Sequence, residues 1–267
     1  PRSRGLGDVY KRQGEENGYF VKIPNRYIQC DITRKFGIGR KFYGTYILIG
    51  FYRTCGDHSW ITVDKVLHSY GYSISTRKTS VFSDAIAVLR VMVENEMIEI
   101  ASDLSKVKAD TGIEIKTNNL VFDTSKNFTI VTIEQFKTIL SLNTKVNKEN
   151  ILLVYLYVKS YIISRKPDIP NPFDYPEAFY KSTDKIVKDL GMSKSTVNKC
   201  LQILTSGEHP LLIKKEMGFS HSEKDKSAKK LPNIYVLNKS GYETEIAWAK
   251  EKLLNITRGN FILANTE

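Results

Sequence analysis

The sequence predicts an α+β fold that is mainly helical, carries small β-hairpins and repeats one arrangement twice in tandem. Apolar residues spaced for helices alternate with short strand candidates along the chain. A set of landmarks occurs twice in the same order. With 267 residues the chain is long enough for two ordinary domains. Its longest apolar run, 151–158, is less than half of the roughly 20 residues that a membrane span needs.

Four landmarks make up the repeat. Each copy has an entry strand, a strongly apolar helix, a short helix ending in glycine, and a longer helix that runs into a strand. The paired segments are, in order, 19–24 and 127–132, 45–52 and 151–161, 63–71 and 183–191, and 80–100 and 193–214. The spacing between the copies grows at 166–176, which holds four of the eight prolines and is typical of a loop. Duplication therefore explains the pattern better than chance.

The repeat predicts a first domain at 18–125, a second at 126–240, and a C-terminal helix and tail at 241–267. The segment 1–17 is interpreted as an artefact or a disordered tail. Within it, DVYKRQ at 8–13 matches one translation of a transposase adapter end used in sequencing libraries. On that interpretation the first residues do not belong to the fold, and the natural N-terminus is missing.

The motif that points most directly to a function lies at 182–205. Ser182 or Thr183 can cap a first helix, and Ser193 can cap a second one. Between them Gly191 can supply the positive φ that a sharp turn needs. The second helix has one apolar stripe, formed by Val197, Cys200, Leu201 and Leu204. The string around the turn, DLGMSKSTV, resembles the helix-turn-helix of many bacterial winged-helix regulators.

This resemblance implies that the second helix enters the major groove of DNA with its N-terminal end facing the bases. Its polar face carries side chains of the types that donate to phosphates or pair with base edges. The expected DNA-binding residues of this helix are Lys194, Ser195, Thr196, Asn198, Lys199 and Gln202.

A basic hairpin is predicted after this helix. Strand candidates at 211–216 and 234–237 flank a lysine-rich stretch at 218–232. Such a hairpin, the wing of the resembled fold, can lie along a phosphate backbone or enter the minor groove. Twelve lysines and six acidic residues fall within 181–239, so more than half of the net charge of +11 lies there. A solvated lysine-rich loop is the alternative. The expected DNA contacts are Lys214, Lys224, Lys226, Lys229 and Lys230.

The first copy is less basic than the second. Its short helix is expected to open at Trp60 and to end near Gly71. Arg77, Lys78 and Thr79 stand where its recognition helix should begin, and they are its expected DNA contacts. The exposed face of the helix that follows includes Asp84 and Glu94, and the first hairpin carries as many acids as lysines. This copy is therefore expected either to contact DNA or to serve packing, dimerisation or the binding of a partner protein.

Two helix candidates, 43–52 and 149–163, are apolar nearly all round, which is typical of buried helices. Their tyrosines could instead stack on the bases of a single-stranded nucleic acid. We favour the buried interpretation, in which each helix is the centre of a domain core. The tyrosines concerned are Tyr46, Tyr52, Tyr155, Tyr157 and Tyr161.

The sequence holds no pattern of an enzyme, a metal site or a cofactor site. The four histidines and three cysteines lack the spacings of metal ligands. Phosphate-loop, dinucleotide and nucleophile-elbow motifs do not occur. The sequence therefore predicts a protein that is not an enzyme and has no cofactor. Three cysteines cannot all pair, which favours a location in the reducing cytoplasm.

The tandem layout over 18–240 resembles that of the replication initiators of bacterial plasmids and phages, which pair two winged-helix domains. In detail, only the turn of the second copy matches. The resemblance implies recognition of double-stranded DNA at the origin of a plasmid, phage or mobile element. It also implies recruitment of a helicase or helicase loader and formation of a homodimer, with no role for a membrane. A transcriptional regulator and a replisome protein-interaction module with little DNA affinity stand as alternatives.

Overall fold

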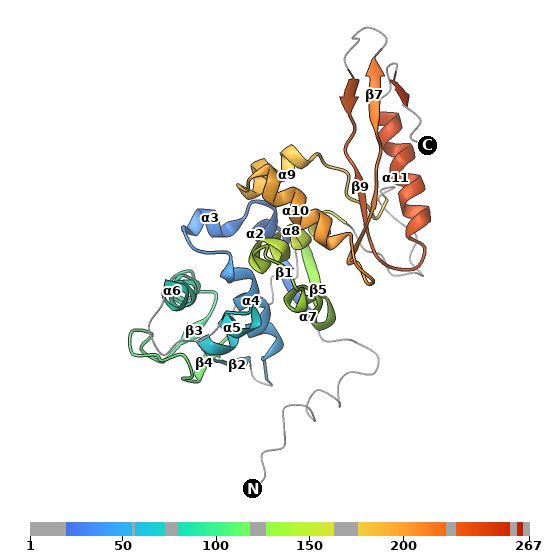
Figure 1. Ribbon diagram of the computed structural model, residues 1–267. Helices are drawn as coiled ribbons and strands as arrows, with labels where there is room; N and C mark the ends of the chain where they lie inside the picture. The colour runs from blue at the N-terminus through green and yellow to red at the C-terminus, as the bar shows by residue number, and fades with distance from the viewer. Residues whose placement is uncertain are drawn as a thin grey trace. The chain divides into compact units, whose positions relative to one another are not determined.

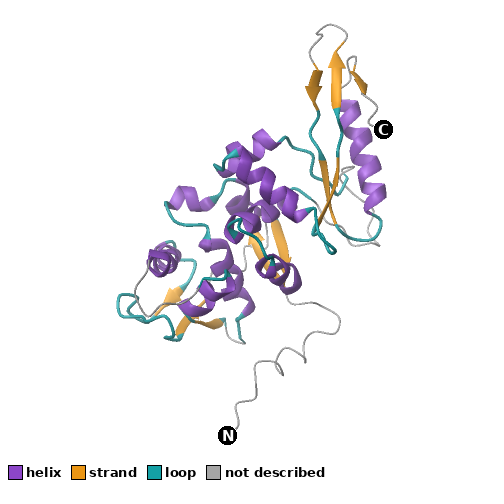
Figure 2. Ribbon diagram, in the orientation of Figure 1, coloured by secondary structure: helices purple, strands orange, loops and turns teal. Residues whose placement is uncertain are grey.

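The computed structural model describes residues 20–54, 57–72, 80–117, 127–162, 176–222, 228–256 and 261–263. These residues form an α+β fold of helices and small antiparallel sheets, so the predicted fold class is confirmed at this level (Figure 2). By proximity of Cα atoms the chain divides into two compact units. The first unit is Pro1–Tyr27 with Ile32–Leu152, and the second is Ile28–Asp31 with Leu153–Glu267.

The first part of the chain alternates short strands and helices (Figure 1). Its elements are β1 (Phe20–Pro24), α2 (Asn25–Gln29), α3 (Ile32–Phe36), α4 (Lys41–Phe51), β2 (His58–Ile61), α5 (Val63–Ser69), α6 (Ser80–Glu94), β3 (Glu99–Ile100), β4 (Ile113–Lys116), β5 (Phe128–Thr132) and α7 (Ile133–Ser141). The division between the units falls within the next helix, α8 (Lys148–Ser160).

The second part of the chain begins with two helices and continues into strands (Figure 1). Its elements are α9 (Thr183–Leu190), α10 (Lys194–Leu204), β6 (Leu212–Lys215), β7 (Phe219–Ser222), β8 (Ala228–Lys230), β9 (Ile234–Leu237), α11 (Tyr242–Ile256) and β10 (Phe261–Leu263). No helix among the described residues is both long enough and apolar enough to cross a membrane.

The two apolar helices are buried, as predicted. In α4 every residue except Gly50 is buried, and the residues of α8 from Ile151 to Val158 have no exposed surface. A helix without a polar face gains stability only when other elements cover it all round, which places it in the core. Tyr46, Tyr155 and Tyr157 are fully buried, so the core interpretation of these three tyrosines is confirmed.

Both units contain the same order of elements around such a helix. In the first unit α4 is followed by β2, α5, α6, β3 and β4, and the sheet order is β2-β4-β3. In the second unit α8 is followed by an extended residue, Phe179, and then by α9, α10, β6 and β9. Phe179 forms an antiparallel bridge to Tyr235 of β9, and β9 pairs with β6. In each unit the segment before the helix pair therefore joins the last strand of the hairpin.

Strand β2 corrects one prediction. The sequence had placed the beginning of a helix at Trp60, but Trp60 and Ile61 end a strand that pairs with β4. Thr62 is the N-cap of α5, and its hydroxyl accepts a hydrogen bond of 3.0 Å from the Lys65 N–H. The strand shows alternate burial, with Ser59 and Ile61 inside, and this period of two outweighs the helical pattern that begins after it.

The two predicted entry strands pair with each other. Phe20 of β1 lies opposite Thr132 of β5, and Pro24 lies opposite Phe128. In the repeat, Phe20 is equivalent to Phe128, and Pro24 is equivalent to Thr132. Exchanging the two copies therefore leaves the same residue pairs in the sheet, so the register is symmetric. Strand β5 pairs with β1 and α7 packs on β5, so residues from 127 to Leu152 belong to the first compact unit.

Candidate nucleic-acid interface

The helix pair α9–α10 has the caps and the turn that the sequence predicts. The Ser182 hydroxyl accepts from the Lys185 N–H at 3.2 Å, and the Ser193 hydroxyl accepts from the Thr196 N–H at 3.1 Å. Gly191 closes α9 with a φ of 57°, a left-handed conformation that costs glycine little. Gly191 and Ser193 end α9 and begin α10 within a few residues, so α10 leaves the turn in a defined direction.

Helix α9 is tied to the core of the second unit by a buried tyrosine. The Tyr157 hydroxyl donates to an Asp189 carboxylate oxygen at 2.6 Å, and the Lys185 ammonium donates to the other oxygen at 2.8 Å. Burial and the hydrogen bond to Asp189 raise the pKa of Tyr157, so this hydroxyl keeps its proton. The apolar stripe of α10 is buried at all four predicted positions, Val197, Cys200, Leu201 and Leu204.

The hairpin predicted after α10 is present in its described part. Strands β6 and β9 pair antiparallel, with Leu212 opposite Leu237. Farther along the hairpin β7 pairs with β8, and β10 adds to the other edge of β7. Helix α11 packs on β9 and closes an apolar cluster behind the hairpin. The buried members of the cluster are Ala178, Met217, Leu231, Ile234, Val236, Ala249 and Leu253.

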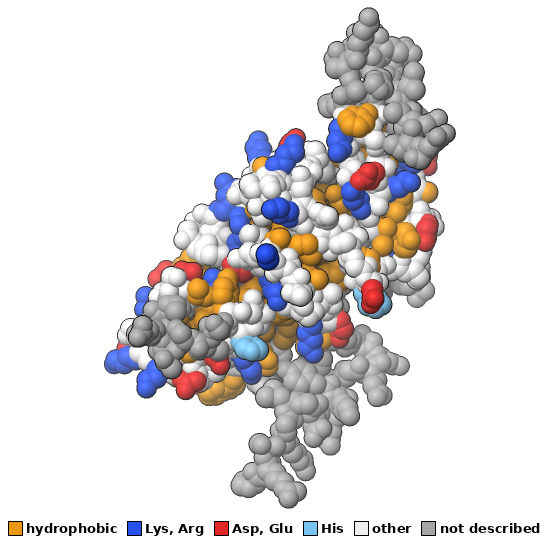
Figure 3. Space-filling model, in the orientation of Figure 1, with side chains coloured by type: hydrophobic (Ala, Val, Ile, Leu, Met, Phe, Trp, Pro, Cys, Tyr) orange, Lys and Arg blue, Asp and Glu red, His pale blue; other side chains and the backbone are white. Residues whose placement is uncertain are grey.

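A groove of about 580 Å³ lies between the helix pair and the hairpin. Five predicted DNA-binding residues converge on it from three elements, and we name it the α10 groove. They are Lys194, Asn198 and Gln202 of α10, Lys214 of β6 and Lys230 of β8. Residues from the start of α9 and from the segment before β9 also line the groove, together with Leu201, Thr205, Glu216 and Tyr235. Lysine and arginine side chains lie over α9 and α10 and beside the strands in Figure 3.

The other predicted residues have different positions. Ser195 and Lys199 are exposed on α10 but do not line the groove. Thr196 is half-buried, and its hydroxyl shares a hydrogen bond of 2.8 Å with the Ser193 cap, so it holds the turn. Lys229 lies in β8, while its side chain is not described. Five residues lie outside the described part of the chain: Arg77, Lys78, Thr79, Lys224 and Lys226.

The α10 groove also contains two carboxylates that the sequence analysis did not single out. The Lys194 ammonium lies 2.9 Å from an Asp184 oxygen, and Lys214 forms an ion pair with Glu216. The hydrogen bond and the charge of Lys214 hold the pKa of Glu216 below its ordinary value. Three lysines and two carboxylates line the groove, so its positive charge is smaller than its lysines alone would give.

One signal in the sequence could have revealed Asp184. Lys194 is the first residue of α10, where the partial positive charge of a helix N-terminus disfavours a cation. A carboxylate nearby offsets this cost, and Asp184 stands in the first turn of α9. The ion pair between Lys214 and Glu216 had a simpler signal in the sequence. Side chains two residues apart in an extended segment lie on the same face, where a lysine and a glutamate can pair.

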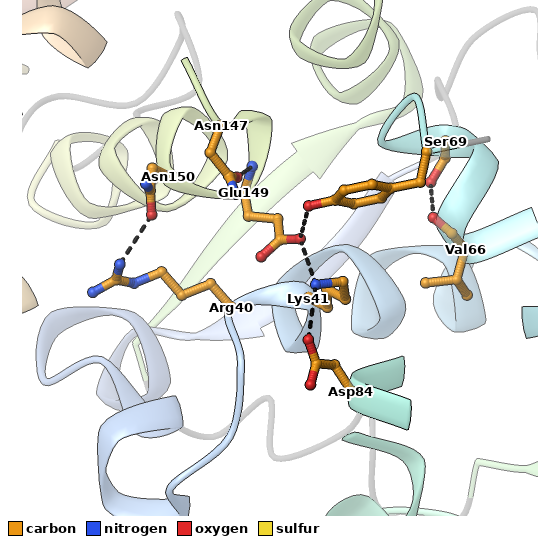
Figure 4. Close-up of polar contacts among 9 residues, drawn as sticks. Arg40, Lys41, Val66, Ser69, Asp84, Asn147, Glu149 and Asn150 are labelled. Carbon is orange, nitrogen blue, oxygen red and sulfur yellow. Dashed lines mark hydrogen bonds and ion pairs between the residues drawn. The ribbon is translucent and has the colours of Figure 1, made fainter. Parts of the chain in front are cut away.

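The first unit carries a different polar cluster, in its interior (Figure 4). Lys41 of α4 and Glu149 of α8 are both buried and lie 3.1 Å apart. Asp84 of α6 approaches the same ammonium at 3.6 Å, and the Tyr72 hydroxyl donates to Glu149 at 3.2 Å. Arg40 donates to Asn150 at 2.9 Å beside them. These contacts join three helices of the first unit.

The charge of Lys41 is stabilised in this cluster. Burial alone lowers the pKa of Lys41, but the charge and hydrogen bond of Glu149, together with Tyr72 and Asp84, more than offset that effect and raise the pKa above its ordinary value. A lysine that keeps its proton is a poor nucleophile, so the cluster acts as a brace between helices. Among the described residues, no group of three or more histidine, cysteine or acidic side chains could hold a metal ion.

No model of a known protein family matches this chain, and no curated protein matches it in sequence.

Proposed function

We propose that this chain binds double-stranded DNA in a sequence-specific manner through two winged-helix domains in tandem, and that the second unit is the main DNA reader. We further propose that it initiates the replication of a plasmid, phage or mobile element. The order of elements in each unit supports the first part. A core helix, an extended segment, a helix pair and a hairpin follow one another, and the extended segment joins the hairpin.

One observation carries the proposal: side chains of α10 and lysines of the hairpin line the same groove. Amide side chains such as Asn198 and Gln202 can form paired hydrogen bonds with an adenine edge in the major groove. Lysines such as Lys214 and Lys230 contact phosphates without regard to sequence. A groove lined by both amides and lysines suits a duplex, because the amides can bind base edges while the lysines contact backbone phosphates.

The first experiment measures binding to duplex DNA over a salt series. The double variant Lys199→Ala with Lys230→Ala should bind every sequence more weakly and reduce the salt slope by about two, because each lost phosphate contact removes about 0.9 from it. The matched control is Lys137→Ala with Lys250→Ala, which removes two exposed lysines on α7 and α11. Equal losses in both double variants, or no measurable binding of the unaltered chain at low salt, would contradict the proposal.

The replication role needs a second measurement. Selection of bound duplexes from a random pool should enrich sites arranged as direct repeats, as an origin recognised by several copies would require. Enrichment of a single palindrome would favour a transcriptional regulator, which reads two half-sites as a dimer. No enrichment would favour a protein-docking module.

The reading of bases by the groove has its own test. Asn198→Ala should cost about 1–3 kcal/mol on the selected site and relax the preference at one base pair, with the salt slope unchanged. Asn255→Ala, which removes an exposed amide side chain from α11 outside the groove lining, is the matched control.

A further inference from the structure

Two lysines that line the α10 groove, Lys194 and Lys214, are each paired with a carboxylate of the same unit. Lys194 and Asp184 come from neighbouring helices, and their side chains are 63% and 75% exposed. Lys214 and Glu216 come from one strand and the residue after it, and the Glu216 side chain is 72% exposed. Carboxylate oxygens and phosphate oxygens make the same kind of charge-assisted hydrogen bond to an ammonium group.

We propose that Lys194 and Lys214 bind phosphates in the groove alongside Lys230, and that Asp184 and Glu216 occupy these two lysines when DNA is absent. This inference rests on the proposed function. The two carboxylates then act as an autoinhibitory contact, because DNA must exchange each of them for a phosphate before the lysines can contribute to binding.

The exchange is physically accessible. Ion pairs between exposed side chains contribute little to stability, so a lysine can leave its carboxylate at small cost. The larger effect follows the exchange, because the released carboxylate stays in the groove beside the phosphate that replaced it. Two negative charges at that distance repel each other, and the repulsion weakens the complex with any sequence.

The position of Lys194 supports the same conclusion. A cation at the first residue of a helix is unfavourable, and α10 has no acidic residue in its first turn to offset it. The carboxylate that does offset it comes from α9 and is exposed in the same groove. A phosphate in the place of Asp184 would satisfy both the ammonium and the helix N-terminus.

The test compares the full chain with Asp184→Asn, Glu216→Gln and the double variant, on both random-sequence and selected duplexes. Each single change should tighten binding about threefold to tenfold on both duplexes and steepen the salt slope by up to about one. The double variant should show both increases. The control is Asp103→Asn with Glu99→Gln, which removes two exposed carboxylates that pair with Lys106 and Lys116 of the first unit.

The outcomes separate this inference from the proposed function. If the unaltered chain does not bind duplex DNA, the proposed function fails, whatever the variants do. If the unaltered chain binds and the groove variants gain no more than the control, the autoinhibitory contact is wrong. A loss of affinity for the selected duplex alone would also overturn it, because Asp184 or Glu216 would then be accepting a hydrogen bond from a cytosine.

A readout in the free and bound protein checks the exchange directly. Carboxyl NMR of Glu216 should give a pKa below the ordinary value in the free chain and a higher pKa after a duplex is added, because Lys214 has left and a phosphate has approached. Lys214→Ala should also raise the pKa in the free chain, but to a smaller extent, because the variant loses the ammonium without gaining a phosphate. An unchanged Glu216 pKa in a saturated complex would show that Lys214 keeps its carboxylate, and the inference would fail.

Discussion

Helices α6 and α10 occupy the same place in the order of elements, yet they present different surfaces. Each follows a short helix and leads into a hairpin, and each buries one apolar stripe. The exposed side of α10 carries Lys194 and Lys199 and no acid. On α6, Arg90 is exposed together with Asp84 and Glu94. The buried stripe thus belongs to the fold, whereas the charge on the opposite face distinguishes what each unit can bind.

The cores of the two units differ as well. The first unit contains the buried Lys41–Glu149 pair, and its central helix approaches Tyr70 closely at Gly44. In the second unit the central helix is tied to the helix pair by the uncharged Tyr157 hydroxyl on Asp189. The first unit should therefore be the more sensitive of the two to single changes in its core.

Glu149→Leu should have the largest effect on stability. The change leaves the Lys41 ammonium buried with only the partly exposed Asp84 nearby, and an uncompensated buried charge costs about 3–5 kcal/mol. Urea denaturation followed by circular dichroism measures the change in unfolding free energy. Adding Lys41→Met to Glu149→Leu should recover most of the loss, because no charge is then buried. A double variant as unstable as the single one would show that packing, and not charge, is responsible.

Gly44→Ala should have the next largest effect. An added Cβ would lie 1.8 Å from the Tyr70 hydroxyl oxygen, and Tyr70 is itself buried. Because one of the two must move, we expect a loss of about 1–3 kcal/mol in unfolding free energy. Gly39→Ala is the control, since a Cβ there meets no atom within 4 Å. Tyr70→Phe in the Gly44→Ala background should recover only part of the loss, because the added Cβ would also lie 2.4 Å from the ring carbon Cζ of Tyr70.

The difference between the two exposed helix faces predicts unequal effects on DNA binding. Lys199→Ala should weaken binding to all duplexes by about 1 kcal/mol and reduce the salt slope by about one. Arg90→Ala, the same loss of charge on α6, should leave both quantities unchanged. Fluorescence anisotropy with a labelled duplex over a salt series measures both. If Arg90→Ala has the larger effect, the first unit is the main DNA reader.

Local patterns in the sequence were enough to predict the apolar helices, the helix pairs and the α9–α10 turn, whereas helices α2, α3 and α7 were not predicted. Gly191, Ser182 and Ser193 act through their own backbone or the next few residues, so their roles are visible in the sequence. The pairing of β1 with β5 was not predicted, because it joins segments far apart in the chain and each segment alone fits an entry strand equally well. Strand β2 was missed because its four residues directly precede a stronger helical pattern.

The candidate site was predictable only in part. The lysines and amides of α10 stand out by their spacing on one face of a helix. The convergence of Lys214 and Lys230 on the same groove depends on how the hairpin folds back beside α10, which no local pattern specifies. Asp184 and Glu216 were overlooked because the net charge of a segment does not show which carboxylate pairs with which lysine. Those ion pairs decide which lysines are available to bind a phosphate.

The smallest predicted effect concerns two lysines, one in each unit, whose pKa values are shifted in opposite directions. Lys159, on the part of α8 that belongs to the second unit, is partly buried, and burial lowers its pKa to about 8. In the unfolded chain the pKa of a lysine is about 10.4. Between these values the unfolded chain binds more protons than the folded one, so stability should rise as the pH increases from about 8 to about 10. The raised pKa of Lys41 predicts the opposite direction in the first unit, with stability lost only above pH 10.

Lys159→Met should therefore stabilise the chain at pH 7 by about 1 kcal/mol, a value reduced from the full shift because the side chain keeps some access to water. The gain should shrink toward zero at pH 10, since the folded chain then holds Lys159 uncharged. Urea denaturation at pH 7, 8.5 and 10 gives the three free energies of unfolding. Lys137→Met, at an exposed position on α7, is the control for the loss of a surface charge. A gain that is the same at all three pH values would mean that Lys159→Met acts through packing, and that burial does not lower the pKa of Lys159.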